Sequence, residues 1–218
     1  MGLNLAHELL LLDLDEAKGS EPLGSMLSYG LVGAVLAELA LADRIHLDDN
    51  RVVIVSSAAL GVNSLDLVLS AIAGHEPLDP EAWVQRLEGR VKEPVANELV
   101  SAGILSHRHR HLLGFLADER YPEVDPGPER ALRARLDAVV VDGAPADPRT
   151  AALAALLDAI GMARNLFHTE GSALDSRLTE LSQGQWAARA VRSVVTRIGI
   201  TMATIAATPT GMGFWPTR

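Results

Sequence analysis

The side chains best suited to chemistry gather in the run His107–His111, whose sequence is HRHRH. If this run is a β-strand, its three imidazoles share one face while Arg108 and Arg110 share the other. Alternating imidazoles could chelate a metal ion, although no cysteine or acidic side chain adjoins them. The guanidinium groups could instead attract an anion such as phosphate, and a third interpretation is a solvated hairpin tip without a ligand. We predict no metal site and keep Arg108 and Arg110 as candidate anion contacts.

No catalytic motif accompanies this run. Cysteine is absent, no serine stands in a Gly-x-Ser-x-Gly setting, and the histidines outside the run are isolated from one another. Gly30 and Gly33 lie inside an apolar stretch instead of following a strand, so they do not form a phosphate-binding loop. We interpret them as sites of close helix packing. The sequence therefore predicts a protein that is not an enzyme and that needs no cofactor.

The clearest of the elements that must position these side chains is a helix predicted at about Gly24–Asp43. Glu38 is the one charge between Leu23 and Ala42, so this helix is apolar on almost every face. Such a helix crosses a membrane or lies in the middle of a protein, and the stretch just reaches spanning length. Its charge, its glycines and its two serines favour a buried central helix.

Apolar periodicity and turn residues predict further helices. They cover Leu65–Ala73, Glu81–Leu87, Val91–Ala102, Glu129–Val141, Arg149–Ala163, Leu174–Leu181 and about Gln185–Ala206. The segment Leu3–Leu14 is expected to be either a short helix or an extended segment. The fold class is therefore mainly α: a compact multi-helix bundle around a buried central helix, with one or two β-hairpins. We expect residues 1–207 to form a single domain and residues 208–218 to be a poorly ordered tail.

Two places favour β-structure. The β-branched segment Val52–Val55 follows the turn residues Asp49 and Asn50, which predicts a turn and then a strand. Further on, Ile104-Leu105 and His111–Phe115 are expected to be the two arms of a hairpin. In that arrangement the residues around His107–Arg110 lie near the tip.

Composition narrows the function classes. Hydrophobic residues make up 48% of the 218 residues and aromatic residues 4%, so the core must be built from Leu, Ala, Val and Ile. A net charge of −9 argues against generic nucleic-acid binding, which needs a basic face. The apolar run near the N-terminus stops at Asp13, has no basic segment before it and is not a signal peptide, and Ala6 stands where a myristoylation signal needs Ser or Thr. We expect a cytoplasmic protein.

One combination is similar to a winged-helix unit: the helix Val91–Ala102, the stop at Gly103 and the hairpin that follows. A helix that reads DNA should be basic and polar on its outer face. This one carries Glu93 and Glu98 against Lys92 alone. A winged helix used as a structural element is favoured, and no nucleic-acid partner is expected.

Several stretches, in their order along the chain, resemble the Golgi phosphoprotein 3 family, including its bacterial branch. They are LAHELLLL (5–12), GLVGAVLAELALADRI (30–45), ELVSAGIL (98–105), LLGF (112–115), Tyr121-Pro122 and DPRTAALAALLDAIG (147–161). The resemblance extends from about residue 3 to residue 206. It implies a mainly α-helical fold with a buried central helix and a projecting hairpin.

The resemblance also implies a peripheral membrane protein, because eukaryotic members bind phosphatidylinositol 4-phosphate. Their pocket uses a tryptophan, an arginine on the central helix and two further basic side chains. By position these fall at Leu23, Val32, Gly89 and Lys92, so Lys92 alone keeps the required character. Arg90 and Arg86 lie close enough in sequence that one could substitute for the missing cation.

The leading hypothesis is a non-enzymatic protein that associates peripherally with anionic, phosphoinositide-containing membranes on their inner face. Its candidate lipid contacts are Lys92, Arg90 and Arg86, with Arg108 and Arg110 as secondary contacts. The alternative is a protein–protein adaptor on the same fold without a lipid site, and a third is a winged-helix nucleic-acid binder. The hairpin could also join copies of the chain, since an exposed strand edge can pair.

Overall fold

The computed structural model describes residues 2–16, 24–112, 116–167, 171–190, 192–193 and 195–196. In chain order the elements are α1 (Leu5–Glu16), α2 (Gly24–Leu41), β1 (Ile45–Asp48), β2 (Arg51–Ile54), α3 (Asn63–Ala73), α4 (Pro80–Arg86), α5 (Lys92–Ser101), β3 (Arg108–Leu112), β4 (Leu116–Arg120), α6 (Gly127–Val140), α7 (Pro148–Ala159), α8 (Ala163–Phe167) and α9 (Ser172–Leu181). The chain is mainly α, as the sequence predicts, with two separate antiparallel hairpins.

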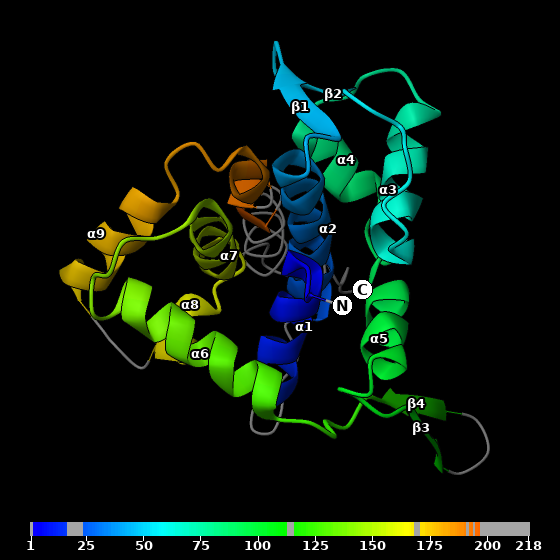
Figure 1. Cartoon of the computed structure of the whole chain (residues 1–218), viewed down its shortest axis with the longest axis vertical. Helices are drawn as coiled ribbons and strands as arrows, with labels where there is room; N and C mark the ends of the chain where they lie inside the picture. Colours follow the sequence, from blue (N-terminus) through cyan, green and yellow to red (C-terminus); the bar gives the residue numbers. More distant parts are fainter. Residues whose placement is uncertain are drawn as a thin grey trace, which may run out of the picture.

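Helix α2 is the central element, as its lack of charge predicts. It packs against α1, α3, α4 and α7, which surround it in Figure 1. Leu31, Val32, Val35 and Leu36 have no exposed surface. Because neighbours surround the helix, apolar residues are favourable on all its faces. Among the described residues, no helix combines the length and the apolarity needed to cross a bilayer.

Gly30 lets α1 and the end of α7 approach α2 closely. A Cβ atom at this position would lie 3.0 Å from Cγ2 of Ile160 and 3.1 Å from Cδ2 of Leu9. These distances are shorter than ordinary van der Waals contacts between carbon atoms. The interpretation of Gly30 as a site of close helix packing is therefore confirmed.

The first hairpin differs in part from the prediction, because the segment before its turn is also a strand. In this hairpin β1 pairs with β2, so that Leu47 lies opposite Val52. Asp49 and Asn50 form the two-residue turn with φ values of 42° and 57°. Asp and Asn tolerate this left-handed conformation, which suits the twist of a tight hairpin. The turn residues Asp49 and Asn50 allowed the reversal of the chain to be predicted. Strand β1 has only four residues, which is too short to be recognised as a strand from the sequence.

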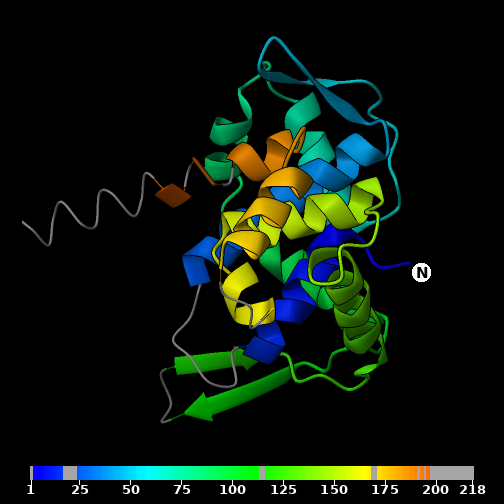
Figure 2. The same cartoon turned by 90° about the vertical axis from the view of Figure 1, so that its left-hand side faces the viewer.

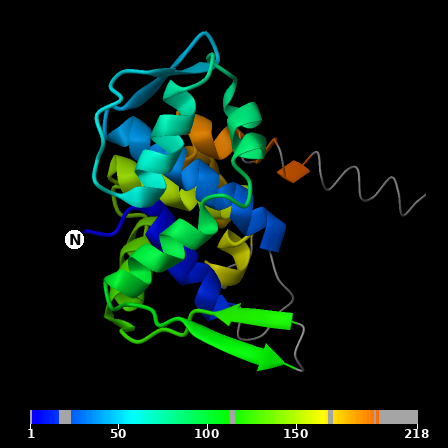
Figure 3. The ribbon, with the colours of Figure 1, turned by 90° about the vertical axis from the view of Figure 1, so that its right-hand side faces the viewer.

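The second hairpin lies further along the chain than predicted. Its arms are β3 and β4, which pair from Arg108 opposite Arg120 to Leu112 opposite Leu116. Ile104 and Leu105 precede β3, and Leu105 forms an isolated antiparallel bridge with Glu123, so the predicted first arm does pair with the returning chain. The prediction of His111–Phe115 as the second arm was wrong, because His111 and Leu112 belong to β3, the first arm. Residues 113–115 lie outside the described residues, and Arg108–Arg110, predicted near the tip, belong to the first arm. Figures 2 and 3 show β3 and β4 at one end of the molecule and β1 and β2 at the other.

Helix boundaries mostly follow turn chemistry, with one correction. The predicted helix Arg149–Ala163 is interrupted, because α7 ends at Ala159 and α8 begins at Ala163. Gly161 between them adopts φ +80°, and the Met162 amide donates to the Leu157 carbonyl at 2.9 Å. This bond pattern closes a helix with a glycine in the left-handed conformation. The predicted tail, residues 208–218, lies outside the described residues.

Candidate functional site

The predicted lipid contacts lie on one short connection between α4 and α5, residues 86–92, which we call the basic turn. Asp79 starts α4 by accepting a hydrogen bond from the Ala82 amide at 2.9 Å, and Pro80 follows it. Proline suits the first turn of a helix because its missing N–H has no partner there. The helix then ends at Arg86 and delivers the chain into the basic turn.

The basic turn is held by buried side chains that alternate with exposed ones. Leu87 has no exposed surface and Val91 has 1% exposed, so both belong to the core. The Arg90 amide donates to the Leu87 carbonyl at 3.1 Å, and Gly89 adopts φ +73°. A left-handed residue at this point costs little only because it is glycine. The backbone of the turn is thus held in place by the buried side chains of Leu87 and Val91, while its other side chains face solvent.

The exposed side chains of the turn carry an excess of positive charge. Arg86, Arg90 and Lys92 are all exposed, and Glu88 lies among them. Within the described residues, none of the three cations is in an ion pair with a carboxylate. Cations that no internal carboxylate neutralises are available for an external anion. The basic turn is therefore the candidate functional site.

Tyr29 connects the central helix to this site. It lies on α2 with 8% of its surface exposed, close enough to Glu88 for this carboxylate to affect the pKa of its hydroxyl. Burial raises the pKa of Tyr29, and the hydrogen bond and negative charge of Glu88 raise it further. The hydroxyl therefore keeps its proton at neutral pH and remains a donor. Sequence reasoning missed this pair because its partners are brought together only by the packing of α2 on α4.

The other predicted site positions lie in different parts of the molecule and do not form one site. Val32 is fully buried in α2 and cannot contact a ligand. Leu23 lies outside the described residues, while Gly89 and Lys92 both belong to the basic turn. Arg108 and Arg110 lie on β3, beyond the far end of α5, so the chain does not bring them beside Lys92 (Figure 3). Their backbone is described, but the directions of their side chains are not.

Within the histidine run, His107 is the residue whose side chain the structure describes. The ring of His107 stacks on Tyr121 with a centroid distance of 5.0 Å and an interplanar angle of 5°. Across the described ranges, no group of three or more His, Cys, Asp or Glu side chains is arranged to hold an ion. His109 and His111 have described backbone only, so the proposed alternation of faces stays a prediction.

A buried polar cluster, which sequence reasoning missed, ties α1 to its neighbours. Nδ1 of His7 accepts a hydrogen bond from the Asn4 amide at 3.1 Å, so Nε2 carries the proton that faces Oε2 of Glu98 at 2.7 Å. Glu98 also accepts from the Ser64 amide at 2.6 Å and from its hydroxyl at 2.9 Å. Burial alone would raise the pKa of Glu98, but these hydrogen bonds outweigh it and lower the pKa below its ordinary value. The spacing of Asn4 and His7 at the start of a helix was the available signal.

A second charged group stabilises the start of α1. Glu38 accepts hydrogen bonds from the Leu5 amide at 2.8 Å and from Nη1 of Arg149 at 2.8 and 2.9 Å. Arg135 reaches Glu8 at 2.9 Å, and Arg149 lies 3.6 Å from the same carboxylate. These arginines and carboxylates neutralise one another, so the cluster joins helices and offers no free charge for a ligand. Glu38, the one charged residue of α2, therefore joins α2 to the start of α1 and to α7.

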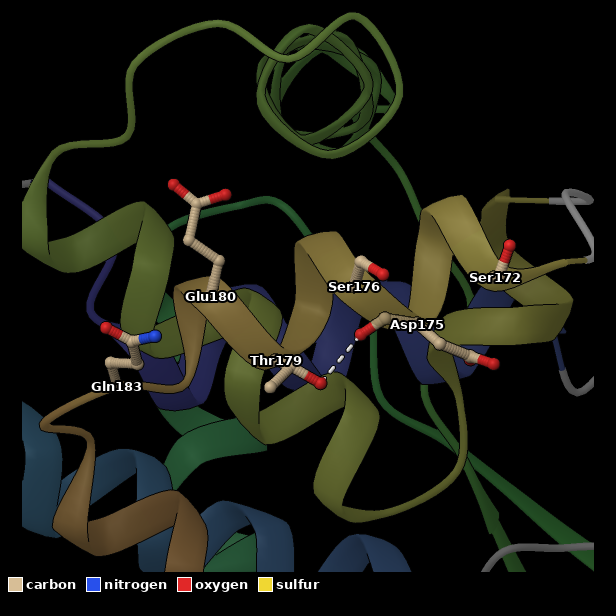
Figure 4. Close-up of a pocket in the computed structure, with 6 residues that line it drawn as sticks. All are labelled: Ser172, Asp175, Ser176, Thr179, Glu180 and Gln183. Atoms are coloured by element: carbon tan, nitrogen blue, oxygen red, sulfur yellow. Dashed lines mark hydrogen bonds between the residues drawn. The ribbon is translucent and has the colours of Figure 1, made fainter.

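A shallow hollow of about 430 Å³ lies along α9 (Figure 4). It is lined by Ser172, Asp175, Ser176, Thr179, Glu180 and Gln183. Its acidic side chains are already paired, since Asp175 meets Arg164 at 3.0 Å and Glu180 meets Arg177 at 2.8 Å. The Thr179 hydroxyl donates to the backbone carbonyl of Asp175 at 2.7 Å. This hollow is a solvated helix face and a weaker candidate than the basic turn.

Comparison with known proteins identifies the family of this chain. The sequence model of the family described as Golgi phosphoprotein 3 (GPP34) matches residues 5–198. Vacuolar protein sorting-associated protein 74 of Eremothecium gossypii is 28% identical over 165 residues, which cover 64% of this chain and 49% of the relative. The chain thus spans about half the length of this curated relative. Since the family match extends over most of the chain, the protein belongs to the Golgi phosphoprotein 3 family.

Proposed function

We propose that this protein is a non-enzymatic peripheral membrane protein that binds anionic lipid headgroups through its basic turn. The observation that carries the proposal is the group of three exposed cations, Arg86, Arg90 and Lys92, on a turn fixed by buried anchors. The proposal is supported by the family resemblance, in which Gly89 and Lys92 of this turn correspond to two positions that contact lipid in eukaryotic members. A protein with a net charge of −9 presents here a local surface of opposite sign.

Phosphatidylinositol 4-phosphate is the lipid that the family resemblance suggests. Its phosphomonoester carries close to two negative charges, and strong capture needs several positioned donors. Val32 supplies no such donor from α2, because it is an apolar side chain without exposed surface. Each basic residue near an anionic surface contributes about 1 kcal/mol, so binding should be weak and should fall as salt screens it. We place the protein at the cytoplasmic face of a membrane, held by this reversible contact.

Vesicle sedimentation tests the proposal. Wild-type protein should bind vesicles that contain phosphatidylinositol 4-phosphate at low salt and should release them as salt is raised. Arg90→Gln should lower the partition coefficient about fivefold, and Arg90→Gln combined with Lys92→Gln about thirtyfold. Arg189→Gln is the matched control, because Arg189 is an exposed arginine elsewhere on the surface. Binding that is absent at low salt, or that falls equally in the control, contradicts the proposal.

A protein–protein adaptor on the same fold is the second candidate. The burial of Val32 favours it, because the arginine that relatives present from the central helix has no counterpart at this position. The two-stranded β3–β4 hairpin also leaves strand edges that a second copy could pair with. The adaptor predicts no binding to any vesicle at low salt, and light scattering would show whether the chain self-associates.

A nucleic-acid reader is the least favoured of the three. Helix α5 buries Val95, Ala96 and Leu99, and its Glu98 turns inward to His7. Its exposed residues include Lys92 and Glu93, whose charges cancel. A helix with no net positive charge on its outer face is poorly suited to a phosphate backbone. A gel shift with duplex DNA at low salt would be the result that favours it.

A further inference from the structure

We propose that His7 is a pH-sensitive cap of α1, which gives up its hydrogen bond to the Asn4 amide when its ring takes a second proton. Acidification then opens the start of α1 without detaching the helix from α5. This inference concerns a device built into the fold, and it does not depend on the lipid binding proposed above.

The two residues that close the start of α1 do so reciprocally. Oδ1 of Asn4 accepts a hydrogen bond from the His7 amide at 2.9 Å, and Nδ1 of His7 accepts one from the Asn4 amide at 3.1 Å. A reciprocal cap of this form usually has Glu or Gln at the position that His7 occupies. Those side chains remain acceptors throughout the pH range in which histidine titrates, whereas an imidazole does not. Helix α1 therefore begins with a cap whose acceptor can be lost close to neutral pH.

The ring of His7 has no second way to accept this hydrogen bond. His7 has 2% of its surface exposed and Asn4 has 6%, so water does not readily take the place of either partner. In the neutral ring Nε2 carries the proton and faces Oε2 of Glu98 at 2.7 Å. A second proton must go to Nδ1, where it would face the Asn4 N–H, and two donors cannot form a hydrogen bond. The protonated ring and the closed cap are therefore mutually exclusive.

Glu98 supplies the attraction that favours the second proton. Burial acts to raise the pKa of Glu98, but the hydrogen bonds from His7 and Ser64 outweigh it and lower the pKa. The carboxylate thus keeps its negative charge where histidine titrates, and a negative charge in contact with an imidazole favours the protonated ring. The Asn4 N–H opposes that protonation from the other side of the ring. The two neighbours of His7 therefore compete over its protonation state.

The other charged groups at this end of α1 are neutralised among themselves. Helices α2, α5, α6 and α7 pack against α1. Four charged side chains of this region bind one another: Glu8, Glu38, Arg135 and Arg149. In the described part of the chain, Glu98 is the charged side chain in contact with the ring of His7. The pH response of the cap therefore depends on His7 and Glu98.

Contacts beside the cap confine the opening to the start of the helix. The Leu5 amide donates to Oε2 of Glu38 at 2.8 Å, and Arg149 donates to the Leu3 carbonyl, so neither contact uses His7. The side chain of Leu5 has no exposed surface, which keeps α1 packed when the cap opens. The Asn4 amide should therefore lose its protection from hydrogen exchange, while the Leu5 amide next to it should keep its protection.

The experiment follows amide exchange and the His7 ring by NMR in the full-length protein between pH 7.5 and pH 5.5. After correction for the intrinsic pH dependence of exchange, the protection of the Asn4 amide should fall about tenfold, and that of the Leu5 amide less than about twofold. Over the same range the nitrogen chemical shifts of the His7 ring should change from those of the Nε2–H tautomer to those of the imidazolium.

Three variants separate the cap from general effects of acid. His7→Gln keeps an acceptor for the Asn4 amide but does not titrate, so protection there should change less than about twofold over this range. His46→Gln is the matched control, because His46 is an exposed histidine on β1 and its loss should leave the wild-type profile unchanged. Glu98→Gln removes the charge that favours the protonated ring, so the fall in protection should move to lower pH.

Several outcomes would overturn the inference. One is a His7 ring that takes its second proton while the Asn4 amide stays protected, and another is a ring that stays neutral down to pH 5.5. A fall in protection that is equal at Asn4 and Leu5, that persists in His7→Gln, or that keeps its pH in Glu98→Gln also refutes it. Thermal melts at both pH values show which variants fold. If His7→Gln does not fold, the ring shifts and the comparison of Asn4 with Leu5 in wild type still decide the question.

Discussion

At the scale of single residues, Glu98 is an ionised side chain whose contacts are all internal. It lies on α5 and joins His7 of α1 to Ser64 at the start of α3. Glu98→Gln keeps the size of the side chain but removes the charge that strengthens these hydrogen bonds. Hydrogen bonds to charged groups contribute about 1.5–3 kcal/mol, so we expect a loss of about 2 kcal/mol in the free energy of unfolding at pH 7. Denaturant unfolding measures it, with Glu93→Gln on the same helix as the control.

The same carboxylate predicts a pH dependence. Its pKa in the folded protein is lower than its ordinary value, because the hydrogen bonds from His7 and Ser64 outweigh the effect of burial. The unfolded state therefore binds the proton more readily, and the stabilisation is complete above the unfolded pKa. It is lost as the pH falls through the folded pKa. The difference in unfolding free energy between wild type and Glu98→Gln should shrink from pH 7 towards pH 3; a difference that is constant over this range would show that the carboxylate's ionisation does not matter.

At the scale of elements, the approach of α1 and α7 to α2 depends on Gly30. Gly30→Ala places a methyl group 3.0 Å from Ile160 and 3.1 Å from Leu9, so the helices must shift or the side chains must leave their rotamers. Such overpacking costs typically 1–3 kcal/mol, which exceeds the gain that alanine brings to a helix. We expect Gly30→Ala to lower the free energy of unfolding by about 1–2 kcal/mol. Gly2→Ala is the control, because a Cβ there meets nothing within 4 Å, and a stabilised Gly30→Ala would contradict the prediction.

Helices and strands could be predicted from the sequence where a single local feature, such as a capping pair or an uncharged stretch, was enough to identify them. The absence of charge placed α2 at the centre, and the pairs Asp79-Pro80 and Asp147-Pro148 marked the starts of α4 and α7. The second hairpin was misplaced because its second arm, Leu116–Arg120, is too polar and acidic to be distinguished from a loop. Its pairing with β3 depends on a reversal of the chain after α5, and a short window of sequence does not reveal that reversal.

The candidate site was predictable only in part for the same reason. Clustering in an acidic chain identified Arg86, Arg90 and Lys92, and the structure places all three on one exposed turn. The influence of Glu88, in the same turn, on the pKa of Tyr29 is a tertiary relation between α2 and the turn, so neither residue's neighbours in sequence indicate it. Glu88 had no distinguishing feature in the sequence.

At the scale of the whole molecule, the core connects elements that are far apart in sequence. Buried residues from Leu5 to Ala190 form one continuous cluster, and Arg149 of α7 donates to the Leu3 carbonyl before α1. The sequence predicts one domain over residues 1–207, and a core of this kind should melt as one unit. Unfolding would then expose the helices and the buried Trp83 together.

Calorimetry tests this single-unit prediction. With about 0.7 kcal/mol per residue near 60 °C, a chain of 218 residues should unfold with an enthalpy on the order of 150 kcal/mol. The van't Hoff enthalpy from the shape of the transition should equal the calorimetric value, whereas two independent halves would give a van't Hoff enthalpy near half of it. Tryptophan fluorescence and far-ultraviolet circular dichroism should share one midpoint, and Glu98→Gln should lower both by the same amount. Separate midpoints, or a shift in one probe alone, would mean that the helices around Glu98 unfold apart from the rest, because the coupling between α1, α3 and α5 would then not extend through α2.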